Sequence, residues 1–444
     1  MSSVTKDTVV EIFKRVYGGA NDLRPKTGVL DDLFPFSPTQ KVGDVYIEGL
    51  SLNDETGYTL AGSAQDAFVI NPAVAGSFKQ LQIQPSQTVI STVLSWGFMS
   101  RSASGGEASF FEGTKYVMKN NLESHNKLLN ILKVYGQSDE RLGTVSYATA
   151  TYRGVSFTNG TGTLTKKDGT TIAFTNGVNT TEKAILLAPG QFASGIFVGR
   201  KGAAIKQLDS SNVVVASGSI VAWDSVLGIV YVDFTPVAAS AVGSHKLAFD
   251  GMESSKEMVG MQKILTNSGT LFGVSAAVEP LWSGTVMDLG STALSLKAIQ
   301  EGIADAVNAG GLEEPLDIVI NPRSFAKLSD DESSYRRYDS SYGSGKSKNG
   351  FETIEYYAAN GLNKIHSSSC VKEGDAFGIV RDHWKCGGSQ LPSFRVQGID
   401  EDVIQPLGDQ AGFSVRSYGD QYLLCRQPAK QVYWKNINDE GTAY

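Results

Sequence analysis

The clearest pattern of hydrophobic positions along the chain predicts one very long helix. Between residues 106 and 134, apolar side chains from Phe111 to Leu132 recur at spacings of seven, four, seven and three, which places them on one face of an α-helix. At 1.5 Å per residue, this helix would be about 43 Å long. Gly136 is expected to end it.

The residues before this helix predict an extended arm and then a long hairpin. A short amphipathic helix around residues 9–17 precedes a proline-containing stretch, so residues 1–40 are expected to form an N-terminal arm. Between 41 and 100, apolar and polar residues alternate as in strands, with glycine and proline between them, which predicts a long hairpin with little core beneath it. The arm has no core of its own, so its apolar residues are expected to lie on a neighbouring surface: Leu30, Leu33, Phe34 and Phe36.

Residues 143–250 predict a small all-β insertion. This region is rich in Thr, Val, Gly and Asn, and its short apolar runs are separated by turn signals, as in a small barrel or sandwich. The alternative is that these strands continue a larger sheet. We predict strands at 170–175, 184–187, 195–198, 213–216, 229–232 and 246–249.

The remainder of the chain predicts an α+β body. A helix over 291–309 is closed by Gly310-Gly311, a strand follows at 316–320, and a second helix starts at Arg323. The polar run 329–350 has the composition of a mobile loop. We then predict a hairpin of strands 365–371 and 376–381 across the turn 372–375, and further strands around 394–396, 413–417 and 421–426.

Composition narrows the class of protein. Charged residues make up 19% of the 444 residues, against about 25% in typical soluble proteins, which predicts a surface that meets something other than water. The net charge of −7, without a basic block, argues against a protein that grips nucleic acid through its phosphates. The three cysteines are too few for a disulfide framework. No apolar run approaches the roughly 20 residues of a membrane span, and the first residues do not read as a cleaved secretion signal.

Two patterns offer candidate chemistry, and both favour an ordinary structural role. Residues 340–347 end like a phosphate-binding loop, but the first glycine position holds serine and no apolar strand leads into the loop. A second set has spacings that suggest zinc ligands: His366, Cys370, His383 and Cys386. If the first two lie on one hairpin strand, they are about 13 Å apart, which is too far for ligands that must each lie within about 2.3 Å of one zinc ion.

No catalytic group stands out. None of the four histidines accompanies a Gly-x-Ser-x-Gly elbow, and His125 falls on the predicted long helix. Carboxylate pairs lie in polar loops, where solvation keeps their behaviour ordinary. We therefore expect no catalytic, cofactor-binding or metal-binding residues, no cofactor and no enzymatic activity. A hydrolase with a scattered site is the less favoured alternative.

Three stretches of sequence resemble a known family. They are residues 257–273, the predicted helix from Ser291 leading into 316–325, and residues 365–378. With the order of elements given above, they resemble the major capsid proteins of tailed bacteriophages, which have the Hong Kong 97 type fold. The resemblance covers most of the chain and rests on that order more than on single residues.

The resemblance implies an α+β capsid fold with an inserted small all-β domain. Its parts would be an N-terminal arm (1–40), an extended hairpin loop (41–100), the spine helix of a peripheral domain (101–142), the β-rich insertion (143–250), peripheral strands (251–289), an axial domain (290–392), and the peripheral return with the C-terminus (393–444).

The resemblance also implies a function. Copies of the chain would assemble into hexamers and pentamers of an icosahedral shell around double-stranded DNA, without sequence-specific binding, in the virion after assembly in the host bacterial cytoplasm. Scaffolding, portal and decoration proteins are the implied partners. Some members cross-link subunits through a lysine on the extended loop; Lys79 is the one candidate here, and an ordinary solvated lysine is preferred. The alternative is another phage structural protein, such as a tail-tube, decoration or receptor-binding component.

Overall fold

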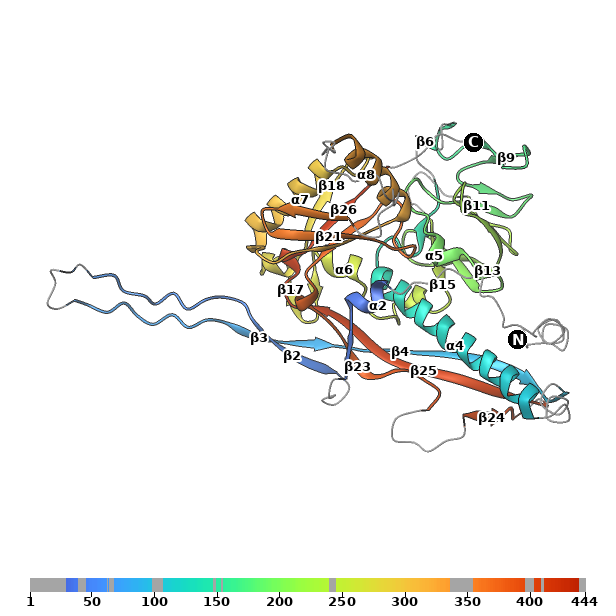
Figure 1. Ribbon diagram of the computed structural model, residues 1–444, viewed down its shortest axis with the longest axis horizontal. Helices are drawn as coiled ribbons and strands as arrows, with labels where there is room; N and C mark the ends of the chain where they lie inside the picture. The colour runs from blue at the N-terminus through green and yellow to red at the C-terminus, as the bar shows by residue number, and fades with distance from the viewer. Residues whose placement is uncertain are drawn as a thin grey trace, which may run out of the picture.

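The computed structural model shows an α+β molecule from which one hairpin projects far beyond the body (Figure 1). The predicted α+β class is confirmed. The helix expected around residues 9–17 and the phosphate-loop-like run 340–347 lie outside the described residues. The structure describes residues 29–38, 45–61, 63, 68–97, 107–146, 149–152, 155–238, 245–335, 354–395, 403–408 and 411–438.

The predicted long helix is confirmed as α4, Glu107–Tyr135, with 29 residues. In Figure 1 it runs beside the long strands β4 (Ser86–Ser95) and β25 (Gly412–Cys425), which pair antiparallel over ten residue pairs. The two strands predicted around 413–417 and 421–426 are thus one strand. The rest of this sheet is formed by β23 (Trp384–Ser393), β1 (Phe36–Pro38) and β24 (Ile404–Pro406). A strand was expected around 394–396, but β23 ends just before these residues, at Ser393.

The predicted hairpin is formed by β2 (Tyr46–Ser51) and β3 (Phe78–Ile83), paired antiparallel from Tyr46↔Ile83 to Ser51↔Phe78. Beyond the strands the two arms stay joined, because the Thr56 amide donates to the Val74 carbonyl at 3.3 Å. The hairpin therefore extends well past its last ladder pair.

A six-stranded sheet forms the body, in the order β18-β26-β22-β19-β21-β20. The predicted strand at 316–320 is confirmed as its central strand β19. The helices beside it are α7 (Leu296–Gly310) and α8 (Pro322–Tyr335). The strands are β18 (Thr285–Asp288), β26 (Val432–Lys435), β22 (Ala376–Ile379), β19 (Asp317–Ile320), β21 (Gly361–Ser367) and β20 (Ile354–Ala358).

Three predictions for this body are wrong in detail. The strands at 365–371 and 376–381 do not form a hairpin, because β19 lies between β21 and β22 and pairs with both. Strand β19 is apolar and buried at three of its four positions, which is typical of a strand in the middle of a covered sheet. Its position between two strands that follow each other in the sequence cannot be predicted from the turn that connects them. Helix α7 starts at Leu296, where the Ser295 side chain caps it. Residues 329–335, expected in a loop, continue helix α8.

The region 143–250 forms a seven-stranded sheet in the order β10-β11-β14-β13-β12-β15-β5 and two small hairpins, β6–β7 and β8–β9. The strands predicted at 170–175, 184–187, 229–232 and 246–249 are confirmed. Strand bounds are β5 (Gly143–Thr144), β6 (Ala150–Tyr152), β7 (Val155–Phe157), β8 (Gly162–Thr165), β9 (Thr171–Phe174), β10 (Val178–Asn179), β11 (Ala184–Leu186), β12 (Ala204–Leu208), β13 (Val214–Asp224), β14 (Ile229–Val232) and β15 (Lys246–Phe249).

The strand predicted at 195–198 is wrong, since these residues belong to the short helix α5 (Ser194–Phe197). Gly195 donates its amide to the Ser369 carbonyl at 2.7 Å, and a Cβ at this position would lie 2.7 Å from backbone atoms of Ser369. The two backbones approach each other closely here. Because this contact is with a segment distant in the sequence, the local pattern of residues does not predict helix α5. The remaining elements are α6 (Met261–Leu265), β16 (Thr270–Leu271), β17 (Val274–Ser275) and the 3₁₀ turns η1 (Met252–Ser254), η2 (Pro280–Trp282), η3 (Arg381–His383) and η4 (Pro428–Lys430).

The largest core joins α4, the seven-stranded sheet and the body, with Tyr135, Ile185 and Phe377 among its members. It also corrects the prediction that the arm has no core to enter. In helix α2 (Val29–Leu33) and just after it, Leu30, Leu33 and Phe34 are at most 1% exposed and belong to this same core. A deletion that tests the arm must therefore stop before Val29.

Candidate functional site

The projecting hairpin, from the last ladder pair Ser51↔Phe78 outward, exposes a series of large apolar side chains. They lie on both arms and are each more than half exposed, with Leu60 at 89% and Val69 at 87%. Monomeric soluble proteins rarely expose apolar surface in continuous stretches, and where they do it marks an interaction site. We call this set the hairpin surface: Tyr58, Leu60, Phe68, Val69, Ile70, Val74 and Phe78.

The base of the hairpin is held by a small core. Tyr46 is fully buried in a cluster with Trp282 and Tyr422, and its ring lies 4.8 Å from that of Tyr422. The Tyr46 hydroxyl donates to the Asp420 carboxylate at 3.2 Å; burial, followed by the charge of Asp420, raises the pKa of Tyr46 to about 12. The base is thus packed, while the distal part has no cover within the described chain.

An ion-pair cluster further fixes the hairpin. The Glu48 carboxylate on β2 pairs with Lys385 and, at 3.3 Å, with Arg426. These partners lie 337 and 378 residues away along the chain, so sequence reasoning had no signal with which to find them. The pairs join β2 to β23 and to the residue that follows β25.

The long helix is attached to the sheet through buried polar contacts. His125 is fully buried and its ring nitrogens hydrogen-bond Thr88 at 2.7 Å and Ser417 at 2.8 Å. Burial lowers the pKa of His125 to about 4, so the ring is neutral at pH 7. One helical turn earlier, the Asn121 amide donates to Thr92 on β4 at 2.8 Å. His125 therefore positions α4 on the sheet.

A buried carboxyl group lies where the end of α4 meets the body. The hydroxyls of Tyr135 and Tyr433 each donate to the Asp375 carboxylate at 2.8 Å, and the Gln262 amide donates to the Tyr433 oxygen at 2.8 Å. Asp375 is 2% exposed. Burial, and then the charge of Glu140, raise the pKa of Asp375 to about 6.

A buried lysine extends this network toward the seven-stranded sheet. The Lys372 ammonium donates to Gln191 at 2.8 Å, lies 3.4 Å from Glu140 and sits 4.5 Å from the centre of the Tyr135 ring. Burial alone would raise the pKa of Glu140, but Lys372 and hydrogen bonds outweigh it and lower that pKa. The network thus joins α4, the residues that follow β11 in region 143–250, and the body.

The four residues with zinc-like spacing have separate partners. His366 pairs with Asp317 at 2.9 Å, while the His383 ring lies 3.3 Å from the Gln431 amide. Cys370 and Cys386 are buried in the largest core. Among the described residues, no group of three or more His, Cys, Asp or Glu is placed to hold a metal ion.

Lys79 is exposed on β3, opposite Leu50. None of the helices within the described ranges is long and apolar enough to cross a membrane.

The comparisons with known proteins identify the fold. The capsid chain of cyanophage A-1(L) superposes with a TM-score of 0.52 over 96% of each chain, at 10% sequence identity. The fold is that of a phage capsid protein. Two further matches are the capsid of a native GTA particle (TM-score 0.46, 8% identity, 95% of this chain and 94% of that one) and the capsid of Myoviridae phage XM1 (0.42, 8%, 96% and 98%). No family model and no curated protein sequence matches.

A capsid-type fold over nearly the whole chain agrees with the features of the hairpin and the long helix. At 10% identity, the likeness resides in the arrangement of elements and not in retained side chains. The expected resemblance is confirmed at the level of the fold. The function of the chain is inferred below from the surfaces described above.

Proposed function

We propose that the chain is the major capsid protein of a tailed double-stranded DNA bacteriophage, assembling through hexamers and pentamers into an icosahedral shell. The observation that supports this most is the hairpin surface, which is apolar, exposed and mounted on a fixed base. Such a surface gains burial only against another molecule. A shell of identical subunits supplies that molecule at every position.

The size of this contribution suits reversible assembly. Burying the seven side chains of the hairpin surface, at about 1.5 kcal/mol each, gives on the order of 10 kcal/mol. Association costs roughly 4–15 kcal/mol in lost translational and rotational freedom. One hairpin contact is therefore weak alone, and stability comes from several contacts per subunit.

The parts of the Hong Kong 97 type fold are proposed as follows. The hairpin is the extended loop, α4 with the β4–β25 sheet is the peripheral domain, and the six-stranded sheet with α7 and α8 is the axial domain. The region 143–250 is the insertion. The protein is located in the virion shell after assembly in the host bacterial cytoplasm, has no catalytic role, and meets scaffolding, portal and decoration proteins.

Electron microscopy of the purified full chain tests this function. We expect closed shells or capsomers from the native sequence, and loss of both in the double variant L60S/V69S, whose side chains are exposed and contribute nothing to the monomer core. The matched control is V213S, an exposed valine (59%) in the seven-stranded sheet region, which should assemble normally. A native protein that stays monomeric at all concentrations and salt conditions contradicts the proposal.

A further inference from the structure

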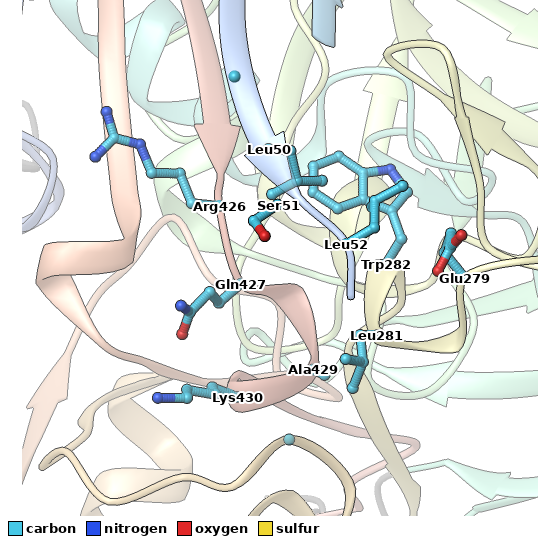
Figure 2. Close-up of a pocket in the computed structure, with 12 residues that line it drawn as sticks. Leu50, Ser51, Leu52, Glu279, Leu281, Trp282, Arg426, Gln427, Ala429 and Lys430 are labelled. Atoms are coloured by element: carbon cyan, nitrogen blue, oxygen red, sulfur yellow. The ribbon is translucent and has the colours of Figure 1, made fainter. Parts of the chain in front are cut away.

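A pocket of about 390 Å³ lies beside the base of the hairpin, and its basic groups are already paired (Figure 2). Arg426 contacts Glu48 at 3.3 Å, and Lys430 contacts Glu314 at 2.9 Å. The carboxylates that neutralise these two cations belong to the same chain. The pocket therefore presents no uncompensated positive charge to a ligand.

A second cleft, of about 860 Å³, lies where the seven-stranded sheet meets the body. Strand β5, at one edge of that sheet, also contacts the residues that follow β11, because Val145 bridges Leu187 and the Ala188 amide donates to the Thr144 carbonyl at 2.8 Å. The sheet is therefore closed into a barrel. The cleft lies over this seam, and its barrel wall includes Thr144, Ala188 and Lys246. Ligand sites occur preferentially where two such parts of a protein meet.

The opposite wall of the cleft comes from the body. Ser291 lies shortly after β18 and Asn436 lies directly after β26, and the Ser291 amide donates to the Asn436 carbonyl at 2.9 Å. Both residues have a left-handed backbone, with φ of 66° and 57°. This conformation is uncommon for serine, and such residues cluster at functional sites. The exposed Ser291 side chain adds a hydroxyl donor to this wall.

Lys246 carries the unmatched charge of the cleft. Two carboxylates also line it, and each has a cation of its own: Asp139 lies 2.9 Å from Lys263, and Glu140 lies 3.4 Å from Lys372. Within the described ranges, the Lys246 ammonium makes no ion pair and no hydrogen bond. The lining of the cleft is therefore left with one cation that is not paired.

Partial burial makes this unpaired charge costly. Burial lowers the pKa of Lys246, and the nearby carboxylates, of which Asp139 has the strongest effect, do not offset it. Asp209 is engaged elsewhere, because its carboxylate accepts the backbone amides of Ser211 and Val213, each at 2.8 Å. A cation that has lost part of its hydration is stabilised best by an anion in direct contact. An oxyanion that hydrogen-bonds Lys246 would remove the cost.

We propose that this cleft is an oxyanion-binding site, in which Lys246 binds a carboxylate or phosphate group and the Ser291 hydroxyl, on the opposite wall, bonds a further oxygen of the same ligand. The volume of the cleft is in the range of small-molecule sites, about 300–1,000 Å³. The ligand is either a free small-molecule anion or the acidic pair Asp439-Glu440, which follows the cleft residue Asn438 in the sequence. In both cases the anion contacts the barrel and the body at once. The inference is independent of the proposed function.

The chemical reactivity of Lys246 tests the site. The purified full chain is treated briefly with an amine-acetylating reagent, and the acetylated fraction of each lysine is measured by peptide mass spectrometry. Lys201, which is exposed in a turn of the same barrel, is the internal control. Inorganic phosphate and succinate are added one at a time, and sodium chloride at equal ionic strength is the blank, so that general screening of charge is matched.

The variant D439N/E440Q distinguishes the two sources of the anion. If the acidic pair is the ligand, Lys246 should react about tenfold faster in this variant than in the native chain, and added phosphate or succinate should restore its protection. If a free anion is the ligand, the variant and the native chain should behave alike, and an added anion should slow Lys246 about tenfold in both. Lys201 should be unaffected throughout. Equal slowing of Lys246 and Lys201, or no slowing of Lys246 in either protein, overturns the site.

Thermal unfolding gives a second measurement in the D439N/E440Q background, in which the acidic pair no longer competes for Lys246. Phosphate that binds the folded chain raises its unfolding midpoint. K246M keeps the unbranched stem of the side chain and removes its charge, so it should abolish this rise. The control is K183M, whose lysine donates to the Asp233 carbonyl on the exposed surface of the barrel, and it should keep the rise. An equal response of K246M and its parent contradicts the assigned role of Lys246.

Discussion

The buried carboxyl group of Asp375 makes the stability of the body depend on pH in an unusual direction. Burial raises its pKa from 3.8 to about 6, so the folded chain keeps a proton that the unfolded chain releases. Stability from this group is therefore complete below about pH 4 and is lost as the pH rises through 6. At 1.36 kcal/mol per pH unit, the full difference is about 3 kcal/mol, of which about 2 kcal/mol falls between pH 4.5 and 7.

The variant D375N isolates this contribution. Asparagine is close in shape and does not titrate, and its amide can still bond both tyrosine hydroxyls that contact Asp375. The change is made within L60S/V69S, which the proposed function predicts to be monomeric, so that subunit concentration does not enter the free energy. Urea unfolding is followed by tryptophan fluorescence, for which Trp434 is a buried reporter on β26, opposite Ala376, the residue after Asp375.

The parent should gain about 2 kcal/mol of unfolding free energy relative to D375N when the pH is lowered from 7 to 4.5. Carboxylates that do not interact with Asp375 titrate in both proteins and cancel in the difference, whereas the interaction with Glu140, which helps to raise the pKa of Asp375, is part of what is measured. If the two pH curves run parallel, Asp375 is already ionised in the folded chain, and the argument from burial is wrong.

Three further variants test two other buried sites by the same unfolding assay. Arg141 and Glu257 form an ion pair in which each side chain is 4% exposed; R141A should cost about 3–5 kcal/mol, and R141M/E257M should recover most of it, whereas an equal loss in both would show that packing, not the unpaired charge, is responsible. Burial lowers the pKa of His125 to about 4, so its contribution is present above pH 6.5 and is lost as the pH falls toward 4, by about 3 kcal/mol. H125Q should remove that acid-side loss, and an unchanged slope between pH 6.5 and 4 would contradict it.

The spacing of apolar residues predicts correctly those elements whose form depends mainly on their own residues. Helix α4 is long enough for its apolar spacing to be unambiguous, and apolar and polar residues alternate along the hairpin strands. The prediction failed where distant segments decide. Strand β19 lies between β21 and β22 and pairs with both. Gly195 lies in helix α5, where its amide donates to the distant Ser369 carbonyl.

The apolar residues of the arm are a second case in which the sequence does not predict what a side chain contacts. Leu30, Leu33 and Phe34 looked like contacts for a neighbour, but they fill the chain's own core beside Trp384, whose ring lies 5.4 Å from that of Phe34. A sequence reveals that a side chain is apolar and does not reveal which surface covers it. The hairpin surface and the arm residues look alike in sequence, and burial alone separates them.

Strand β25 connects the base of the hairpin with the long helix. It carries the Asp420 and Tyr422 contacts of the hairpin base near one end and the Ser417 contact of α4 farther along. Its 14 residues span about 46 Å. A load applied to the hairpin would therefore reach the long helix along the backbone of β25 and its ladder with β4, because the contacts of both elements lie on this one strand.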